Sequence, residues 1–316
     1  MKTYKVKISD KDTLWDLEKC IQNCSVKVSV NEKILLCGAM HGFSYEEVNN
    51  LLVKHGYGKI GRSKSNVHAI KGIKRERPLL SIIIPVYNEE NTVRLVLDAL
   101  VEKQFARVDK ELIIVESNST DHTREIVKEY EKLPCVKLVL EDRPQGKGHG
   151  VRTGLAHATG DFISFQDGDM EYDIDDYDKL LEPLVEYQKA FVLGSRHLKG
   201  KSMREFSDQK LVSRVMNVAH VVFTWMVNVV CRSHMKDPFT MYKLFQRECI
   251  YRMPLECNRF DFDWEIVIKL IRKGFLPLEI PITYCSRSYS EGKKVSFIKD
   301  PLTWMRALIR YGVLKK

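Results

Sequence analysis

Two aspartates one residue apart, Asp167 and Asp169, directly follow the short apolar segment 161–166. The length and composition of this segment predict a buried strand, and open α/β folds bind ligands at the carboxyl ends of such strands. Two carboxylates at this edge can hold a divalent cation, and hard oxygen ligands favour Mg²⁺ or Mn²⁺ bridging a diphosphate. An Asp-x-Asp pair also occurs in turns and at helix starts, so the prediction depends on the segments around it.

Three upstream segments point to the same chemistry. The apolar runs 79–85 and 110–115 predict buried strands, and each is followed by a polar loop and a helical pattern. The loop 142–150 is basic and rich in glycine, and it precedes a helix that carries Arg152. Glycine lets a backbone approach a ligand closely, and the start of a helix favours anions. The alternation of strands and helices therefore predicts an α/β nucleotide-binding half-domain.

The motifs in these segments resemble the signature of inverting family 2 glycosyltransferases with a GT-A fold. They are, in chain order, Ile84-Pro-Val-Tyr-Asn-Glu-Glu90, Val115-Glu-Ser-Asn-Ser-Thr-Asp121, Gly146-Lys-Gly148 with Arg152, and Gln166-Asp-Gly-Asp-Met-Glu-Tyr-Asp173. Later motifs resemble the branch that contains dolichyl-phosphate mannose synthase and bacterial polyprenyl-phosphate relatives. These motifs are Gly194-Ser-Arg196, Asp237-Pro-Phe-Thr-Met-Tyr-Lys243, Glu265 and the segment 280–294. The resemblance extends over about 79–312, roughly three quarters of the chain.

The resemblance implies a donor site for a nucleotide sugar. It places a Mg²⁺ or Mn²⁺ ion on Asp167 and Asp169, where the ion would neutralise the charge that grows on the leaving nucleoside diphosphate. The residues implied around the donor are Pro85, Tyr87, Glu89, Glu116, Lys147, Arg152 and Asp167. The family often carries Asp-Asp-Gly where this chain has Glu116-Ser-Asn118, and this difference leaves the donor open between a GDP-sugar and a UDP-sugar.

The resemblance also implies a polyprenyl-phosphate acceptor. Arg196 follows the apolar run 191–195, and a guanidinium group matches two phosphate oxygens at once. A surface arginine in an ordinary ion pair is the alternative. The mannose synthases add a basic residue and a serine on the next helix, where this chain has Lys210 and Ser213, although the expected arginine falls on Gln209. Arg287 completes the predicted acceptor site.

The type of acceptor decides whether catalysis needs a base. A phosphate is already an anion, whereas a sugar or small-molecule hydroxyl needs a carboxylate within hydrogen-bond reach. The segment 260–265 offers Asp261, Asp263 and Glu265, with Asp263 as the candidate catalytic base. Acidic residues also commonly stand at the start of a helix, which is the simpler interpretation.

Three functions follow from these patterns. We favour transfer to a polyprenyl phosphate, because Arg287 and the segment 291–294 bring cations to the expected acceptor side. The alternatives are transfer to a hydroxyl and an inactive binding protein built on the GT-A fold. The intact Asp167 and Asp169 argue against the inactive protein.

The chain of 316 residues has room for a large domain and a small one. We expect a small helical domain over 1–75, with helices near 12–22 and 43–57, then a GT-A domain over 79–296 and a basic amphipathic helix over 297–316. The small domain either packs on its neighbour, which we prefer, or binds a partner or nucleic acid. Its Cys20, Cys24, Cys37 and His41 have zinc-like spacing, but the first two also continue an apolar helix stripe.

The charge and the hydropathy of the chain predict its ligands and its place in the cell. The formal net charge of +9 suits an anionic ligand or surface, and the motifs favour a nucleotide and a lipid phosphate over nucleic acid. The first seven residues lack the apolar core of a secretory signal, so we expect a cytoplasmic protein at the inner face of the membrane, without a transmembrane helix. The segment 215–230 is shorter than the ~20 residues a span needs, which predicts a buried or interfacial helix. The segment 297–316 predicts either an interfacial helix or a cover on the catalytic core.

Overall fold

The structure is a computed structural model of the whole chain. It describes the strands at 4–6, 26–28 and 35–37 and the residues 77–186, 189–197, 203–204, 210–250, 253–287 and 299–314. Strands β1 (Tyr4–Val6), β2 (Val26–Val28) and β3 (Leu35–Cys37) form an antiparallel sheet in the order β1-β3-β2. The sequence predicted helices and no strands in this region. Both of those helices, and the side chains of the proposed zinc ligands, lie outside the described residues.

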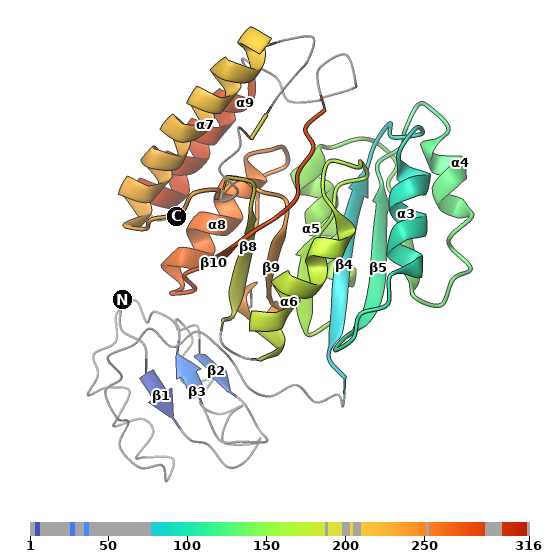
Figure 1. Cartoon of the computed structure of the whole chain (residues 1–316), viewed down its shortest axis with the longest axis horizontal. Coiled ribbons are helices and arrows are strands. Elements are labelled where there is room, and N and C mark those ends of the chain that lie inside the picture. The colour runs from blue at the N-terminus through green and yellow to red at the C-terminus, as the bar shows by residue number, and fades with distance from the viewer. Residues whose placement is uncertain are drawn as a thin grey trace.

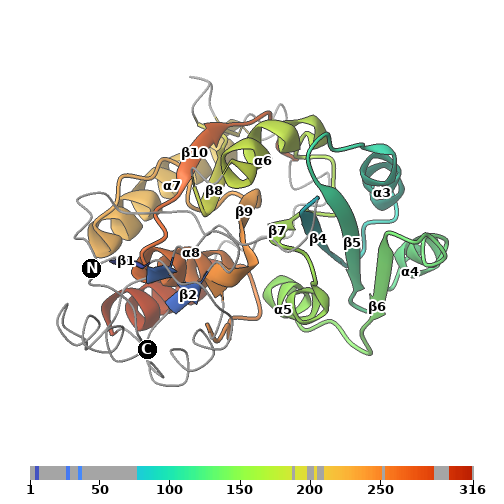
Figure 2. The same ribbon diagram turned by 90° about the horizontal axis from the view of Figure 1, so that it is seen from below.

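The large sheet is mixed and has the order β10-β8-β9-β7-β4-β5-β6 (Figures 1 and 2). Its strands are β4 (Leu79–Val86), β5 (Asp109–Glu116), β6 (Val136–Leu140), β7 (Phe162–Phe165), β8 (Phe191–Ser195), β9 (Lys243–Gln246) and β10 (Leu278–Pro281). Strands β7, β4, β5 and β6 are parallel, β10 is parallel to β8, and β9 runs antiparallel between β7 and β8. This architecture confirms the predicted α/β class.

Helices cover both faces of the sheet. On one face lie α3 (Val93–Glu102), α4 (Thr123–Lys128) and α6 (Tyr177–Val185), and on the other lie α5 (Lys147–His157) and α8 (Phe262–Arg272), as Figure 2 shows. Short 3-10 helices span Ile174–Asp176 and Arg247–Ile250. Because both faces are covered, the central strands are apolar without alternation.

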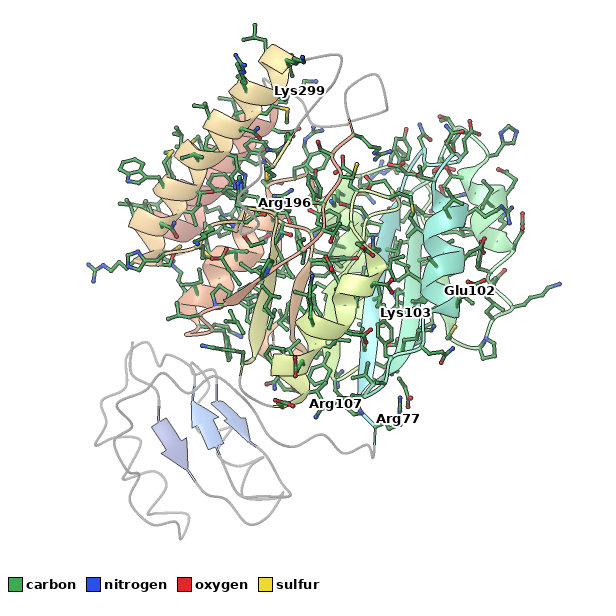
Figure 3. All side chains as sticks on the ribbon, viewed as in Figure 1. Arg77, Glu102, Lys103, Arg107, Arg196 and Lys299 are labelled. Atoms are coloured by element: carbon green, nitrogen blue, oxygen red, sulfur yellow. The ribbon has the colours of Figure 1, made fainter. Side chains whose placement is uncertain are left out.

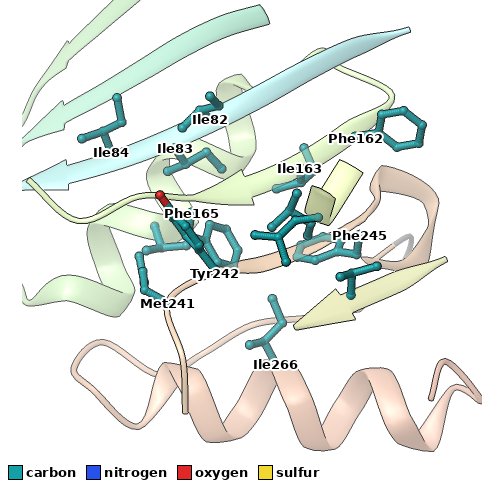
Figure 4. Close-up of a cluster of buried hydrophobic side chains, with 14 of the residues drawn as sticks. Ile82, Ile83, Ile84, Phe162, Ile163, Phe165, Met241, Tyr242, Phe245 and Ile266 are labelled. Carbon is teal, nitrogen blue, oxygen red and sulfur yellow. The ribbon is translucent and has the colours of Figure 1, made fainter. Parts of the chain in front are cut away.

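The core lies at the centre of the sheet (Figure 4). Ile82, Ile83 and Ile84 of β4 have no exposed surface, and Phe165 of β7 packs edge to face against Phe245 of β9 at 5.7 Å. Strands β4 and β5 are paired in register along their full length. The three polar loops that follow β4, β5 and β7 therefore meet at one edge of the sheet.

Helix α5 packs unusually close to β4. A Cβ atom added to Gly154 would lie 2.3 Å from Cγ2 of Ile83, and one added to Gly146 would lie 2.4 Å from the carbonyl oxygen of Asn258. Gly146 also has a φ of 102°, which strains any residue with a side chain. The predicted glycine-rich loop thus lets the first turn of α5, which begins at Lys147, lie against the sheet edge.

Two helices cover one end of the sheet beside α8. They are α7 (Lys210–Cys231) and α9 (Lys299–Ala307), which continues as the π-helical turn η3 (Leu308–Val313). Figure 1 shows them side by side, and Phe223 of α7 contacts Trp304 of α9 at a centroid distance of 5.4 Å. One face of the C-terminal helix therefore packs on α7 and α8.

Helix α7 is longer than the sequence indicated. It has 22 residues and is apolar enough, by length and composition alone, to cross a bilayer. The helix exceeds the apolar segment 215–230 because it begins at Lys210 and includes charged residues outside the apolar run. Only 17% of its most apolar stretch of 18 residues is buried.

Candidate active site

A cavity of about 970 Å³ opens at the carboxyl ends of β4, β5, β7 and β8. Its polar side is formed by Glu89, Lys147, Asp167, Asp169, Arg196, Arg204, Asp263 and Arg287. Its apolar side is formed by Val215, Met216, Ala219, Phe223, Phe239, Trp264 and Trp304. The cavity therefore joins a charged compartment at the sheet edge to an aromatic compartment between α7, α8 and α9.

The two aspartates of the Asp-Gly-Asp motif lie in the charged compartment. Asp167 forms an ion pair with Lys147 at 2.5 Å, and buried Asp169 forms an ion pair with Arg287. Burial raises the pKa of Asp169 to about 7, and the negative charges of Asp167 and Glu171 add to this effect. The compartment thus favours additional positive charge.

Arg287 connects three acidic side chains at this end of the cavity. Its guanidinium group contacts Asp169 and lies 3.0 Å from Glu89, and its backbone N–H donates to Glu171 at 2.7 Å. Burial alone would lower the pKa of Arg287, but the hydrogen bond to Glu89 and the charge of Asp169 outweigh burial and raise it. The structure therefore places Arg287 at the carboxylates predicted to bind metal and donor.

The carboxylates fit a divalent cation shared with a ligand. Within the described part of the chain, no three His, Cys, Asp or Glu side chains stand together as a complete metal site. Asp167 and Asp169 offer two hard ligands, and Mg²⁺ commonly takes one or two carboxylates and completes its octahedron with phosphate oxygens and water. The negative charges of Asp167 and Glu171 beside Asp169 are consistent with such a site.

A second cluster centres on Arg196, which lies between the strand ends and α7 (Figure 3). Its Nε and Nη2 atoms both donate to Asp237 at 2.7 Å, and its backbone N–H donates to the same carboxylate at 2.9 Å. The Arg196 side chain is only 5% exposed. Asp237 is itself held by Glu279 of β10, which accepts its backbone N–H at 2.7 Å. Arg196 is therefore a fixed, buried arginine rather than a surface one.

Two further basic residues reach the cavity here, and the sequence analysis missed both. Arg204 has buried Nε and Nη1 atoms without a hydrogen-bond partner, and burial and the charge of Arg196 lower its pKa. His220 of α7 lies 3.6 Å from Asp237, and burial lowers its pKa to about 3. One carboxylate, Asp237, thus faces two arginines. The only sequence signal was the density of basic residues after Arg196.

The chain matches a known family over this region. Residues 81–250 correspond to the family described as Glycosyl transferase family 2. The chain belongs to this family. The predicted resemblance is therefore confirmed at the level of the family.

Two curated relatives of this family 2 glycosyltransferase are also glycosyltransferases by name. A dolichyl-phosphate beta-glucosyltransferase of Trichomonas vaginalis is 28% identical over 245 residues, 73% of this chain and 71% of the relative. Glycosyltransferase AglJ of Haloferax volcanii is 25% identical over 222 residues, 69% of this chain and 67% of the relative.

Solved structures show the same fold. Glucosyl-3-phosphoglycerate synthase from Mycobacterium tuberculosis has a TM-score of 0.54 at 17% identity, covering 86% of this chain and 85% of its own. Mannosyl-3-phosphoglycerate synthase from Rubrobacter xylanophilus has a TM-score of 0.54 at 16% identity, covering 75% and 74%. Crystal structures of the mycobacterial synthase hold uridine diphosphate with Mg²⁺ or Mn²⁺. These likenesses confirm the predicted GT-A fold.

Most of the predicted donor residues of this family 2 glycosyltransferase line the cavity. Pro85, Tyr87 and Glu89 do so together with Lys147 and Asp167. Two others lie behind the wall. Glu116 is fully buried, pairs with Arg124 and accepts the backbone N–H of Ser119 at 2.6 Å. Arg152 donates to the carbonyl of Leu255 at 3.2 Å and to Asn258, so it supports the segment that faces α5.

Two predicted acceptor residues are not brought to the cavity. Lys210 is exposed at the start of α7, and the hydroxyl of Ser213 donates to the carbonyl of Lys210 at 3.0 Å. Neither side chain lines the cavity. The basic group that stands near Arg196 in this glycosyltransferase is Arg204 instead.

Of the three acidic residues in 260–265, only Asp263 lines the cavity. It pairs at 2.5 Å with Lys243, a fully buried lysine of β9. Asp261 accepts the backbone N–H of Arg259 at 3.0 Å beside the start of α8. Buried Glu265 accepts the backbone N–H of Cys257 at 2.8 Å, so Glu265 supports the loop before α8.

Proposed function

We propose that this family 2 glycosyltransferase moves a sugar from a nucleotide-diphosphate sugar to a polyprenyl phosphate. The observation that carries the proposal is the position of Arg204. Arg204 lines the cavity, its Nε and Nη1 atoms are buried without a hydrogen-bond partner, and the aromatic compartment of Phe223, Trp264 and Trp304 belongs to the same cavity. A lipid with an anionic headgroup and a long apolar chain matches a cavity that has Arg204 in its wall and an aromatic compartment beside it.

The energetics of Arg204 favour an anionic ligand. A buried hydrogen-bond donor without a partner costs roughly 1–3 kcal/mol, so a group that accepts from it recovers this cost on binding. A phosphate suits the site, because two of its oxygens can accept from one guanidinium group. Asp237 balances the charge of Arg196 and fixes its orientation. The charge of Arg204 is then left for the acceptor.

The aromatic compartment suits an isoprenoid chain. Phe239 stacks on Trp264 at 4.5 Å, and Trp264 lies parallel to Trp304 at 6.1 Å with an interplanar angle of 14°. These rings come from three different segments, and they make an apolar wall that a purely polar acceptor would not use. The dolichyl-phosphate acceptor in the name of the Trichomonas relative supports the same class of substrate.

The donor would lie in the charged compartment. Pro85, Tyr87 and Glu89 would contact the nucleoside, with Lys147 and Asp167 beside the diphosphate. A Mg²⁺ or Mn²⁺ ion on Asp167 and Asp169 would supply charge stabilisation for the leaving nucleoside diphosphate. Arg196 and Arg204 would hold the acceptor phosphate, whose oxygen is already an anion and attacks the anomeric carbon without a base.

A single displacement of this kind inverts the anomeric centre. An α-linked donor should therefore give a β-linked product, as the name of the Trichomonas relative also suggests. The coupling constant of the anomeric proton in the product, measured by NMR, checks this outcome. Net retention would exclude a single displacement.

A direct test combines labelled GDP- and UDP-sugars with undecaprenyl phosphate, undecaprenol and 3-phosphoglycerate, followed by organic extraction. We expect transfer to the lipid phosphate alone. Arg204→Ala should raise the KM for the lipid phosphate by about 10- to 100-fold, since a charged hydrogen bond contributes roughly 1.5–3 kcal/mol. The donor affinity, measured by calorimetry, should stay unchanged. Arg247→Ala removes an exposed arginine outside the cavity and serves as the matched control.

One observation favours a hydroxyl acceptor as the second candidate: Asp263 lines the same cavity and could remove a proton. In that case undecaprenol or another hydroxyl compound accepts the sugar, Arg204→Ala transfers normally, and Asp263→Asn is inactive although folded. That combination would replace the lipid-phosphate proposal.

A further inference from the structure

The outer face of α7 carries an uninterrupted apolar stripe. Its members are Leu211, Val215, Val218, Val222, Trp225 and Val229, all exposed to solvent. They recur every three or four residues, so they share one side of the helix, and the stripe is about 27 Å long at 1.5 Å per residue. Soluble proteins seldom leave so many neighbouring apolar side chains exposed unless the surface has a partner.

The opposite side of α7 faces the protein. Ser213, His220, Thr224 and Val227 are buried there, and α7 packs on α8 and η3. The helix is thus fixed along the domain by its more polar side and presents its apolar side outward. This is the orientation of a helix that lies in a membrane interface rather than one that crosses it.

The sign of the surrounding charge points to an anionic partner. Over α7 and residues 299–314 as described, every exposed charged side chain is basic: Lys210, Arg214, Lys299 and Arg306. The acidic residue in these segments, Asp300, is buried and paired with Arg259 at 3.0 Å. An apolar stripe with basic residues at its N-terminal end and on the neighbouring helix α9, and with no exposed acidic residue in these segments, complements a leaflet that contains anionic lipids.

A second copy of the chain fits the stripe less well. When two helices pair, charged residues beside the apolar seam usually set their register. On α7 the positions beside the stripe carry a single charge, that of Arg214. The others are Val212, Ala219, Val221, Met226 and Asn228. Val215 is also 55% exposed and lines the cavity. A partner helix on the stripe would therefore cover the edge of the cavity, whereas a lipid layer would supply the acceptor there.

We propose that the apolar stripe of α7 docks into an anionic membrane leaflet and that the acceptor chain enters the cavity beside Val215. The docking stands on the stripe and its charge, whereas the entry of the acceptor rests on the proposed function. The lipid substrate then reaches Arg196 and Arg204 while its chain remains in an apolar environment.

Trp225 reports the docking directly, because its side chain lies on the stripe and is 64% exposed. With phosphatidylcholine vesicles that contain phosphatidylglycerol, the full-length protein should float with the lipid, and brominated lipid should quench part of its tryptophan emission. Trp225→Phe should remove most of that quenching. Vesicles of phosphatidylcholine alone should bind more weakly, and added salt should reduce the difference.

Val222→Glu places a charge in the middle of the stripe, and Leu95→Glu places one at an exposed apolar position of α3 as the matched control. Val222→Glu should lower vesicle binding at least tenfold, and Leu95→Glu should not. With a short, water-soluble prenyl phosphate, Val222→Glu should remain active, and it should lose transfer only to a long-chain acceptor in vesicles.

Vesicle binding that Val222→Glu leaves unchanged would overturn the docking. A dimer in light scattering that Val222→Glu dissociates, without vesicle binding, would assign the stripe to an interface between copies. If docking depends on Trp225 and Val222 but no prenyl phosphate accepts sugar, the proposed function fails and the docking stands. If the protein transfers sugar to the short-chain prenyl phosphate but does not bind vesicles, the docking proposal fails and the proposed function stands.

Discussion

At the scale of single residues, Arg287, which the sequence predicted to bind the acceptor, lies against the carboxylates predicted to bind the metal and the donor. Its guanidinium group bonds Asp169 and Glu89, and its backbone bonds Glu171. It thereby balances acidic groups that would otherwise repel one another across a buried space. The sequence predicted an acceptor contact because Arg287 and the segment 291–294 bring cations to the expected acceptor side, and the order of motifs does not determine where such a loop folds back.

Removal of Arg287 should make the acidic compartment bind cations more tightly. Without its guanidinium group, Asp169 and Glu89 lose a partner, and we expect the Mn²⁺ affinity of Arg287→Ala in the absence of donor to rise by about tenfold, equivalent to about 1.4 kcal/mol. Calorimetry with Mn²⁺ measures this change, and Arg287→Lys should behave almost as the wild type. Unchanged Mn²⁺ affinity would mean that these carboxylates do not bind the metal.

His220 should give the protein a specific sensitivity to acid. Burial lowers its pKa from 6.5 to about 3. Between pH 6.5 and pH 3 this histidine is therefore protonated in the unfolded chain and neutral in the folded chain. Its contribution to stability is present above pH 6.5 and is lost as the pH falls toward 3, by about 1.4 kcal/mol per pH unit. Urea unfolding at several pH values should show a shallower loss for His220→Gln. His234→Gln, at an exposed position, should keep the slope of the wild type.

At the scale of elements, β9 and α8 are joined by the pair of Lys243 and Asp263. Asp263→Asn leaves a fully buried lysine without its partner, and we expect this variant to lose about 3–5 kcal/mol of unfolding free energy. The double change Lys243→Met with Asp263→Asn should recover much of it. Urea denaturation distinguishes this loss of stability from loss of a catalytic base. A single variant as stable as the wild type would show that the pair is solvated.

The sequence predicted the elements that are buried on both faces. The apolar runs 79–85, 110–115 and 161–166 became β4, β5 and β7, because strands covered on both sides need continuous apolar residues. It did not predict that β9 runs antiparallel between β7 and β8, since that pairing joins segments far apart in the chain. The length of α7 was also underestimated, because the helix begins at Lys210, five residues before the apolar segment 215–230.

At the scale of the whole molecule, the donor side of the site was easier to predict than the acceptor side. Asp167, Lys147 and Pro85 each lie at the end of a strand or the start of a helix, and the topology brings such positions together. Arg204 and His220 stand in no comparable position, and they meet only because α7 packs against the strand ends. A basic residue in a polar stretch belongs to no hydrophobic pattern, so the sequence does not predict its position in the fold.

The hydrogen bonds of Glu279 connect the edge of the sheet to the cavity. Glu279 lies on β10 and accepts the backbone N–H groups of Lys236 and Asp237 at 2.9 and 2.7 Å, and Asp237 in turn holds Arg196. Although Glu279 does not line the cavity, a double-mutant cycle of Glu279→Gln with Arg196→Ala should give a coupling free energy of about 0.5–3 kcal/mol in acceptor binding. The outermost strand of the sheet is then, in thermodynamic terms, part of the acceptor site.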